Sequence, residues 1–202
     1  MTLELTSPMP VLATERLRLR PFTLLDAPEI QRLAGAREVA AGTLRIPHPY
    51  PDGMAEAWVL SQRGSYERGE ELALAIVRAA DDALVGAIGL AFARDDGHAE
   101  LGYWIGVPYW GLGYATEAAR ALVAYGFRSL GLQRIHARHF ASNPASGRVL
   151  RKVGMTHEGR QRRHVRKWER LEDLELYGIL YEDFAQATPS GDTPPPSGGD
   201  VA

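Results

Sequence analysis

The stretch from Ile105 to Thr116 constrains the fold of this chain more than any other part. It reads Ile-Gly-Val-Pro-Tyr-Trp-Gly-Leu-Gly-Tyr-Ala-Thr, so an apolar strand ends at a proline, passes two glycines and enters a helical pattern. The helix is predicted to continue to about Ser129, because small and aliphatic residues recur at helical spacing. A short strand, Arg134–His139, follows it. This order predicts a crossover between two parallel strands.

The remaining strands are predicted from apolar or alternating runs. Turn signals such as Asp95-Asp96-Gly97 separate these runs, which is typical of antiparallel neighbours. The runs are Thr14–Arg20, Leu72–Val77, Leu84–Phe92, Glu100–Val107, Thr156–Arg163 and Leu171–Leu180. Together with the strand after the crossover they make about seven strands.

Three further segments predict helices. Asp26–Ala34 begins with an aspartate that can cap a helix and has an early proline. Asp52–Gly64 has apolar residues along one side, and Asn143–Gly154 ends at a glycine stop signal. The predicted fold class is α+β, a single mixed sheet of about seven strands with helices on both faces.

Composition separates one domain from the two ends of the chain. Residues 11–185 hold the patterned segments and are predicted to form a single domain after a loose lead-in at 1–10. Residues 186–202 are dominated by proline and glycine, which predicts a disordered tail. The chain is 45% hydrophobic, which is enough for one substantial core.

Charge and residue content narrow the class of protein. A formal net charge of −2 does not favour a nucleic-acid binder. The absence of cysteine excludes disulfides, a thiol nucleophile and thiolate metal sites. No apolar run approaches the roughly 18 residues of a membrane span, and the N-terminus lacks the basic start of a signal peptide. These features predict a cytoplasmic protein.

The glycine turn suits a ligand that contains phosphate. Glycine lets the backbone approach a ligand closely, and a helix N-terminus offers free N–H groups. The pattern is not that of a dinucleotide fold, because Thr116 occupies the third glycine position, and it is not a P-loop. On spacing alone, a tight turn with packing glycines explains the pattern equally well.

Four stretches, in order along the chain, match one known family. They are Thr14-Glu-Arg-Leu-Arg-Leu-Arg-Pro21, Glu100-Leu-Gly-Tyr-Trp-Ile105, Trp110-Gly-Leu-Gly-Tyr-Ala115, and Asn143-Pro-Ala-Ser146 followed by Arg151-Lys-Val-Gly-Met155. The third is similar to the acetyl-CoA motif Gln/Arg-x-x-Gly-x-Gly/Ala, with Trp110 in place of Gln or Arg. The chain thus resembles the GNAT superfamily of N-acetyltransferases, in its RimJ/RimL-like branch, over about residues 14–182.

The resemblance implies acetyl-CoA as the acyl-donor cosubstrate and no metal. Main-chain groups of Ile105 and Val107 would pair with the pantetheine arm, and Asn143 would hydrogen-bond to it. The turn that would hold the pyrophosphate consists of Trp110, Gly111, Leu112, Gly113, Tyr114, Ala115 and Thr116.

The resemblance also implies direct attack of an amine on the thioester. Glu100 is the leading candidate for the base, although a structural carboxylate paired with an arginine explains it equally well, and Glu158 is a weaker candidate. Many relatives carry a tyrosine at the position of Leu150. The leucine side chain cannot donate a proton as that tyrosine could. Ser146 is therefore the candidate acid near the sulfur. Tyr103 and the neighbouring tryptophan are expected in the core and the cleft wall.

Three residues are candidates for contact with the acceptor. His48 and Tyr50 lie in a Pro-His-Pro-Tyr loop, where the family builds its acceptor pocket. His139 is a third candidate, although a structural histidine is favoured. His136 and His139 face opposite sides of one strand, so they cannot share a metal.

The run Arg160–Trp168 is the one concentrated basic segment, and it is predicted to lie in the hairpin between the last two strands. It could meet the 3′-phosphate of CoA, ribosomal RNA beside a protein acceptor, or an acidic peptide. The sequence does not choose among these.

The expected function is acetyl transfer to a primary amine, either a protein N-terminus of the ribosomal-protein type or a small molecule. One alternative is a non-catalytic CoA-binding sensor, suggested by Leu150 and Trp110. Another is a protein that docks on the ribosome or RNA through the basic run. The expected partners are acetyl-CoA and the amine, with no membrane and with nucleic acid only in a ribosomal context. Homodimers joined through the final strands are common in the superfamily.

Overall fold

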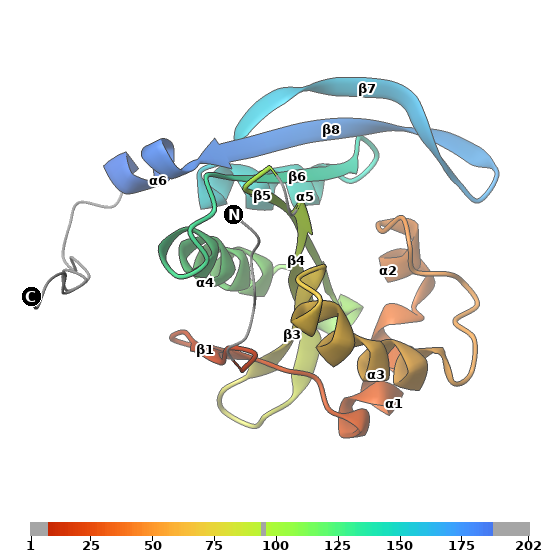
Figure 1. The fold of residues 1–202 in the computed structure, drawn as a ribbon. Helices are drawn as coiled ribbons and strands as arrows, with labels where there is room; N and C mark the ends of the chain where they lie inside the picture. The colour runs from red at the N-terminus through yellow and green to blue at the C-terminus, as the bar shows by residue number, and fades with distance from the viewer. Residues whose placement is uncertain (1–7, 94–95, 188–202) are drawn as a thin grey trace, which may run out of the picture.

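The computed structural model describes residues 8–93 and 96–187, which form one eight-stranded mixed sheet flanked by helices (Figure 1). The strands are β1 (Leu12–Ala13), β2 (Leu17–Arg20), β3 (Glu71–Arg78), β4 (Leu84–Ala93), β5 (His98–Ile105), β6 (Arg134–Phe140), β7 (Thr156–Lys167) and β8 (Arg170–Leu180). The predicted α+β class with a single mixed sheet is confirmed. The additional strand is β1, which is too short to show a pattern in the sequence.

The strand order is β1-β2-β3-β4-β5-β6-β8-β7. Strands β1 to β5 are antiparallel to their neighbours, as are β6, β8 and β7. Only β5 and β6 pair in parallel, across the predicted strand–helix–strand crossover.

Helices cover both faces of the sheet. They are η1 (Leu24–Asp26), α1 (Ala27–Ala34), α2 (Arg37–Ala41), α3 (Met54–Glu67), η2 (Val107–Tyr109), α4 (Tyr114–Arg128), α5 (Pro144–Val153) and α6 (Tyr181–Ala187). α4 packs against α5 and β5, whereas α1 packs against α3 and β4. Figure 1 shows α4 and the group α1–α3 on opposite sides of the central strands. The buried stripe of α4 belongs to the larger of two apolar clusters.

Several element boundaries differ from the prediction. α3 continues beyond Gly64 to Glu67, because Tyr66 in its last turn is buried and this burial stabilises the added turn. α2 was not predicted, since five residues are too few to show a helical period. Asp26 does not cap α1 with its side chain. Its carboxylate instead binds the Arg20 guanidinium at 2.7 and 2.8 Å.

The basic run Arg160–Trp168 lies almost entirely in β7, so the predicted strand end at Arg163 is wrong. Exposed charged side chains hide the strand pattern in the sequence, whereas main-chain pairing with β8 defines it. The register shifts between Gln161 and Val165, and Arg163 has a φ of 49°, so a bulge bends the strand there.

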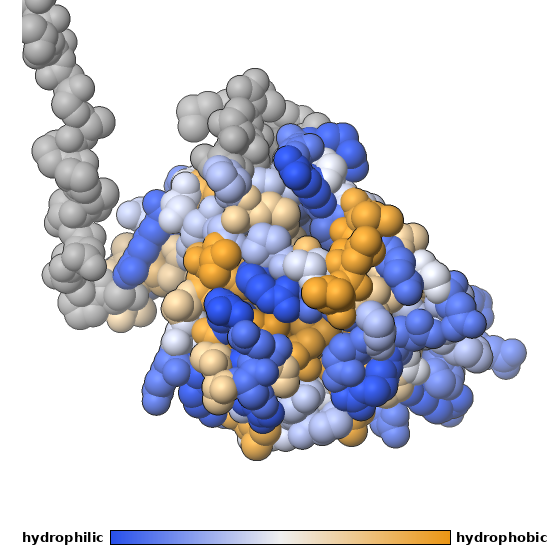
Figure 2. All heavy atoms as spheres, turned by 90° about the horizontal axis from the view of Figure 1, so that it is seen from below, coloured by the Kyte–Doolittle hydropathy of each residue, from blue (hydrophilic) through white to orange (hydrophobic). Residues whose placement is uncertain are grey.

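Some expectations fall outside the described residues: the hairpin turn at Asp95, most of the lead-in, and nearly all of the predicted tail. No helix within residues 8–93 and 96–187 is long and apolar enough to cross a bilayer. Figure 2 shows the molecule from below, where hydrophobic side chains gather in a band between hydrophilic ones.

Candidate functional site

A gap opens within the sheet between β5 and β6. These strands pair only where His98–Glu100 faces Arg134–His136, whereas β6 stays paired with β8 up to Phe140. From Leu101 onward, one edge of β5 therefore has no partner among the described strands. A cavity of about 1290 Å³ occupies this region and is lined by residues of β3 to β6, α2, α4 and α5.

The N-terminus of α4 lies at one end of this cavity. Gly111 and Gly113 precede it with φ of 78° and 84°, the left-handed region that favours glycine. The first bond within the helix runs from the Glu117 N–H to the Gly113 carbonyl, at 3.1 Å. The N–H groups of residues 113–116 are therefore left for an external acceptor, and the helix dipole adds positive potential. A Cβ at Gly111 would meet only open space.

An ion pair between Arg16, which directly precedes β2, and Glu117 of α4 stabilises this turn. The Glu117 carboxylate accepts hydrogen bonds from the Thr14 hydroxyl at 2.6 Å and from Arg16 Nε at 2.7 Å. Burial acts to raise the pKa of Glu117, but these bonds outweigh it and hold the pKa below its ordinary value. Arg16 Nη1 also donates to the Leu112 carbonyl at 3.0 Å. The Leu112 side chain is exposed and does not line the cavity.

Trp110 ties the turn to the end of β5. Its indole Nε1 donates to the Ile105 carbonyl at 2.7 Å. The Gly106 N–H donates to Val85 in β4, so the Ile105 N–H, one residue earlier, faces the open edge. Val107 lies in η2, its carbonyl accepts the Trp110 N–H at 3.2 Å, and it does not line the cavity. The strand that the sequence extends to Val107 therefore ends at Ile105, and a contact of the Val107 main chain with the pantetheine arm stays a prediction.

α5 brings two predicted residues to the cavity. Asn143 caps the helix by accepting the Ser146 N–H at 3.3 Å, and its side-chain nitrogen is turned toward Gly42. The Ser146 hydroxyl lies 2.8 Å from the hydroxyl of Tyr103 on β5. Burial raises the pKa of Tyr103 to about 12, so this phenol keeps its proton. The sequence placed Tyr103 in the wall but missed its pairing with Ser146. Leu150, one turn further along, is buried.

Glu100 faces the side of β5 opposite to Tyr103, since the two are three residues apart on one strand. Its carboxylate accepts a 2.8 Å hydrogen bond from Arg138 Nε on β6. This ion pair spans the two strands where they begin to diverge, and Glu100 also lines the cavity. The predicted pairing with an arginine is present. Glu100 is also open to the cavity, as a base that contacts the substrate must be.

The family model for the acetyltransferase (GNAT) domain matches residues 16–156 of the chain. The chain belongs to the GNAT acetyltransferase family. It is 33% identical to the uncharacterized N-acetyltransferase YoaA of Bacillus subtilis over 172 residues, which cover 85% of this chain and 97% of YoaA. It is 31% identical to the uncharacterized N-acetyltransferase p20 of Bacillus licheniformis over 179 residues, or 88% of this chain and 99% of the relative.

Solved structures agree in fold with this GNAT acetyltransferase. A GNAT-family acetyltransferase from Bacillus anthracis matches with a TM-score of 0.77 at 25% identity, covering 86% of this chain and 99% of that one. RimL, a ribosomal L7/L12 acetyltransferase solved with CoA, matches with a TM-score of 0.77 at 18% identity, covering 85% and 98%. These structures show the shared fold, whereas the family model and the two Bacillus relatives show that the protein is an N-acetyltransferase.

The residues present fit acetyl-CoA. The free N–H groups of residues 113–116 suit a pyrophosphate, and the open space at Gly111 lets the ligand approach the backbone. The unpaired edge of β5 suits the amide groups of a pantetheine arm. Tyr114, Ala115 and Thr116 of the predicted turn all line the cavity. Within the described residues no group of three or more His, Cys, Asp and Glu is arranged to hold a metal.

The three predicted acceptor residues do not come together. His48 and Tyr50 lie outside the cavity lining, and the His48 ring is 3.0 Å from the Gly35 carbonyl. His139 is buried, lines the cavity and packs against Gly147 of α5, on the face opposite to Glu100. Its Nδ1 contacts the Phe140 carbonyl, and burial lowers its pKa, so the ring is neutral at pH 7.

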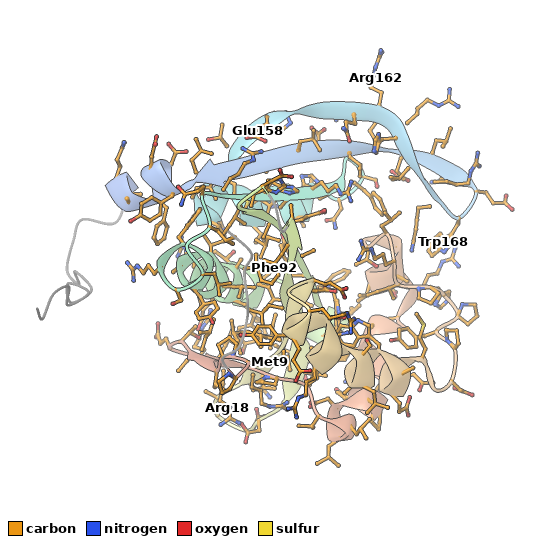
Figure 3. All side chains as sticks on the ribbon, viewed as in Figure 1. Met9, Arg18, Phe92, Glu158, Arg162 and Trp168 are labelled. Carbon is orange, nitrogen blue, oxygen red and sulfur yellow. The ribbon has the colours of Figure 1, made fainter. Side chains whose placement is uncertain are left out.

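The tip of the β7–β8 hairpin closes the other end of the cavity, which the sequence did not reveal. Lys167 Nζ donates to the Ile46 carbonyl at 2.8 Å and lies 3.5 Å from the Leu44 carbonyl. The Arg37 guanidinium lies 5.0 Å from the centre of the Trp168 ring. Figure 3 shows Trp168 between the hairpin and α2, whereas Arg162 points away from the molecule. The last residues of the basic run thus line the cavity.

Proposed function

We propose that acetyl-CoA binds in the gap between β5 and β6, with its pyrophosphate at the α4 N-terminus and its pantetheine arm along the open edge of β5. One observation carries this proposal: the unpaired edge that begins at Leu101 leads directly to the free N–H groups of residues 113–116. From across the gap, the side-chain amide of Asn143 can donate to the arm, since only its oxygen is used in capping α5.

The acceptor amine enters from the face that carries Glu100 and α2. Acetyl-CoA supplies an acetyl group that is activated as a thioester. Glu100 removes a proton from the acceptor ammonium, directly or through water, and such a base contributes roughly 10²–10⁴-fold to the rate. The neutral nitrogen then forms the new bond to carbon as the carbon–sulfur bond breaks. The proton that this nitrogen loses passes through water to the leaving thiolate, so the products are the amide and free CoA. The Ile105 N–H, which faces the open edge, donates to the carbonyl oxygen as charge develops on it.

Ser146 serves the leaving sulfur in this proposal. Tyr103 keeps its proton and can donate to Ser146 Oγ, or to the Ser146 carbonyl at 3.3 Å. When Tyr103 donates, the Ser146 hydroxyl hydrogen is free to turn toward the thiolate. Tyr103 is a positioning residue here, whereas Ser146 touches the reacting group. Leu150 supplies no proton, so Ser146 stands in for the tyrosine of other relatives.

The proposed acceptor is a primary amine, either a protein N-terminus or a small molecule, and the proposed location is the cytoplasm. Structural neighbours include enzymes named for ribosomal proteins and for spermidine, at identities of 18–23% that speak only for the fold. The class of amine therefore has to be inferred from the residues that line the acceptor side of the cavity.

Release of free CoA from acetyl-CoA tests the proposal. The purified protein is offered a panel of small amines and of peptides with free N-termini. Amine-dependent release supports the proposal, and its absence across the panel contradicts it. Thermal unfolding with acetyl-CoA runs in parallel, because a ligand at a hundredfold excess over its Kd stabilises the folded state by about 2.7 kcal/mol. Stabilisation without turnover would favour the sensor instead.

A further inference from the structure

A second carboxylate faces the acceptor side of the cavity. Glu71, the first residue of β3, is half-buried and lines the cavity. In the described part of the chain, no group donates a hydrogen bond to its carboxylate. The predicted base on β5, by contrast, is already engaged by Arg138.

Glu71 and Glu100 lie on one row of the sheet. Ala91 of β4 stands directly opposite Glu71 on one side and opposite Glu100 on the other. Residues that face each other in antiparallel strands project to the same side of the sheet. Because the two glutamates are two strands apart, their backbones are about 10 Å apart.

The floor beside these carboxylates carries almost no side chain. The neighbouring row consists of Ala73, Gly89 and Gly102, which are paired in register across the same three strands. A Cβ placed on Gly102 would meet nothing within 4 Å. An extended alkyl chain can therefore lie on this floor, with one end near Glu100 and the other near Glu71.

The Glu71 carboxylate has no direct partner among residues 8–93 and 96–187. Burial raises its pKa, and within this part of the chain only Arg45, an exposed residue of the loop after α2, acts electrostatically to lower the pKa. A half-buried carboxylate is destabilised unless a cation or hydrogen-bond donor reaches it. A cationic group that enters the cavity would supply this partner.

We propose that Glu71 binds a second positive charge of the acceptor, so that the enzyme selects amines carrying a further cationic group within about 10 Å of the reacting nitrogen. This inference rests on the proposed function, because it takes the Glu100 side of the cavity as the place of the reacting amine. It makes Glu71 a specificity-determining residue, separate from the base and from the acetyl-CoA site.

The test compares two acceptors that differ in a single charge: cadaverine and n-pentylamine. The wild-type enzyme is expected to have the higher kcat/KM for cadaverine. Glu71→Gln is expected to lower that preference about tenfold, the typical value of a hydrogen bond to a charged group. The kcat/KM for n-pentylamine and the KM for acetyl-CoA should not change. Glu71→Asp should keep part of the preference. The matched control is Glu67→Gln, which removes an exposed carboxylate on α3 outside the cavity.

Arg45→Gln separates recognition from a structural role. If Glu71 binds the acceptor, removing the competing Arg45 cation should raise the preference for cadaverine. If Glu71 only holds Arg45, the Arg45 and Glu71 variants should change kcat/KM in the same direction, which would overturn the inference. Thermal unfolding with acetyl-CoA verifies that each variant folds.

Two outcomes for the wild-type enzyme keep the proposals apart. Equal use of both amines overturns the role of Glu71 and leaves the acetyltransferase reaction standing. Failure to acetylate any amine or peptide overturns the proposed function, and the inference falls with it.

Discussion

At the scale of single residues, the proposed acetyl-CoA site depends on positions where a side chain is missing. Gly113 combines a left-handed φ of 84° with the N-cap of α4, beside the free N–H groups. At Gly113 a Cβ would lie 3.4 Å from Arg16 Nη2. That distance is an ordinary van der Waals contact, so the left-handed φ rather than crowding favours glycine there, and the sequence signal for the site is the spacing of the two glycines.

Gly113→Glu is expected to abolish acetyl-CoA binding, because it places bulk and negative charge beside the pyrophosphate. Isothermal titration calorimetry of the folded variant measures the loss. The control is Gly131→Glu, since Gly131 also has a positive φ and open space around it. Both substitutions carry a backbone cost of about 1–2 kcal/mol. Unchanged affinity in the Gly113 variant would contradict the assigned site.

Glu100→Gln is expected to lower kcat by roughly 10²–10⁴-fold while the Kd for acetyl-CoA stays the same. The pH–rate profile should also change, because the glutamine amide cannot accept a proton from the amine. Glu158→Gln is the control: that carboxylate pairs with Arg134, outside the cavity lining. A Glu100 variant with a wild-type pH–rate profile would remove Glu100 as the base.

At the scale of elements, the β7–β8 hairpin reaches across the molecule to the loop after α2. Lys167 is buried although it is charged, and burial lowers its pKa. Its contacts are main-chain carbonyls of the loop rather than a carboxylate. The hairpin tip thus holds the loop after α2 beside the cavity, whereas the rest of the basic run lies on the surface.

Lys167→Met is expected to raise the KM for the acceptor several-fold, because the loop around Ile46 loses its hydrogen bonds, worth about 1.5–3 kcal/mol for a charged donor. The KM for acetyl-CoA should stay unchanged, since the α4 end of the cavity is not involved. Steady-state kinetics with each substrate varied in turn measures both constants. Arg166→Met, on the exposed neighbouring residue, should change neither. If the Lys167 variant and the wild-type enzyme have the same KM for the acceptor, the hairpin does not shape the cavity.

At the scale of the whole molecule, ion pairs that join separate elements make stability depend on pH. Burial acts to raise the pKa of Asp26, but bonds from Arg20 and Thr23 outweigh it and lower the pKa. The pKa values of Glu117 and Glu158 are likewise lowered, because arginine partners and other donors stabilise their charged forms. A carboxyl group whose pKa is lower in the folded state stabilises the folded protein, and this contribution is fully present above the unfolded pKa. That contribution is lost as the pH falls through the folded value.

The free energy of unfolding is therefore expected to be nearly constant around neutral pH and to fall below about pH 4. Asp26→Asn should lower it by about 3 kcal/mol at neutral pH, because the half-buried Arg20 loses its partner, and should flatten the acid fall. Urea unfolding at a series of pH values measures both effects. Asp81→Asn, in an exposed pair with Arg78, should have little effect. An acid fall of unchanged slope in the Asp26 variant would contradict this assignment.

The sequence by itself determined the order of the elements, the class of the fold and the family. These follow from local patterns: the helical and strand periods are short, and left-handed turns call for glycine wherever they occur. The sequence therefore locates the turn at Gly111 and Gly113. It also assigns Glu100, Asn143 and Ser146 to the elements that bring them to the cavity.

Only the tertiary structure decided how these residues are partnered. The pairings of Glu100 with Arg138 and of Tyr103 with Ser146, and the reach of Lys167 to Ile46, join segments far apart in the chain. The strand register that sets Glu71 in one row with Glu100 is likewise fixed by packing across the sheet. No local period encodes such register, so the partners of Glu100 and Ser146 and the place of Glu71 beside Glu100 became visible only when the strands were paired.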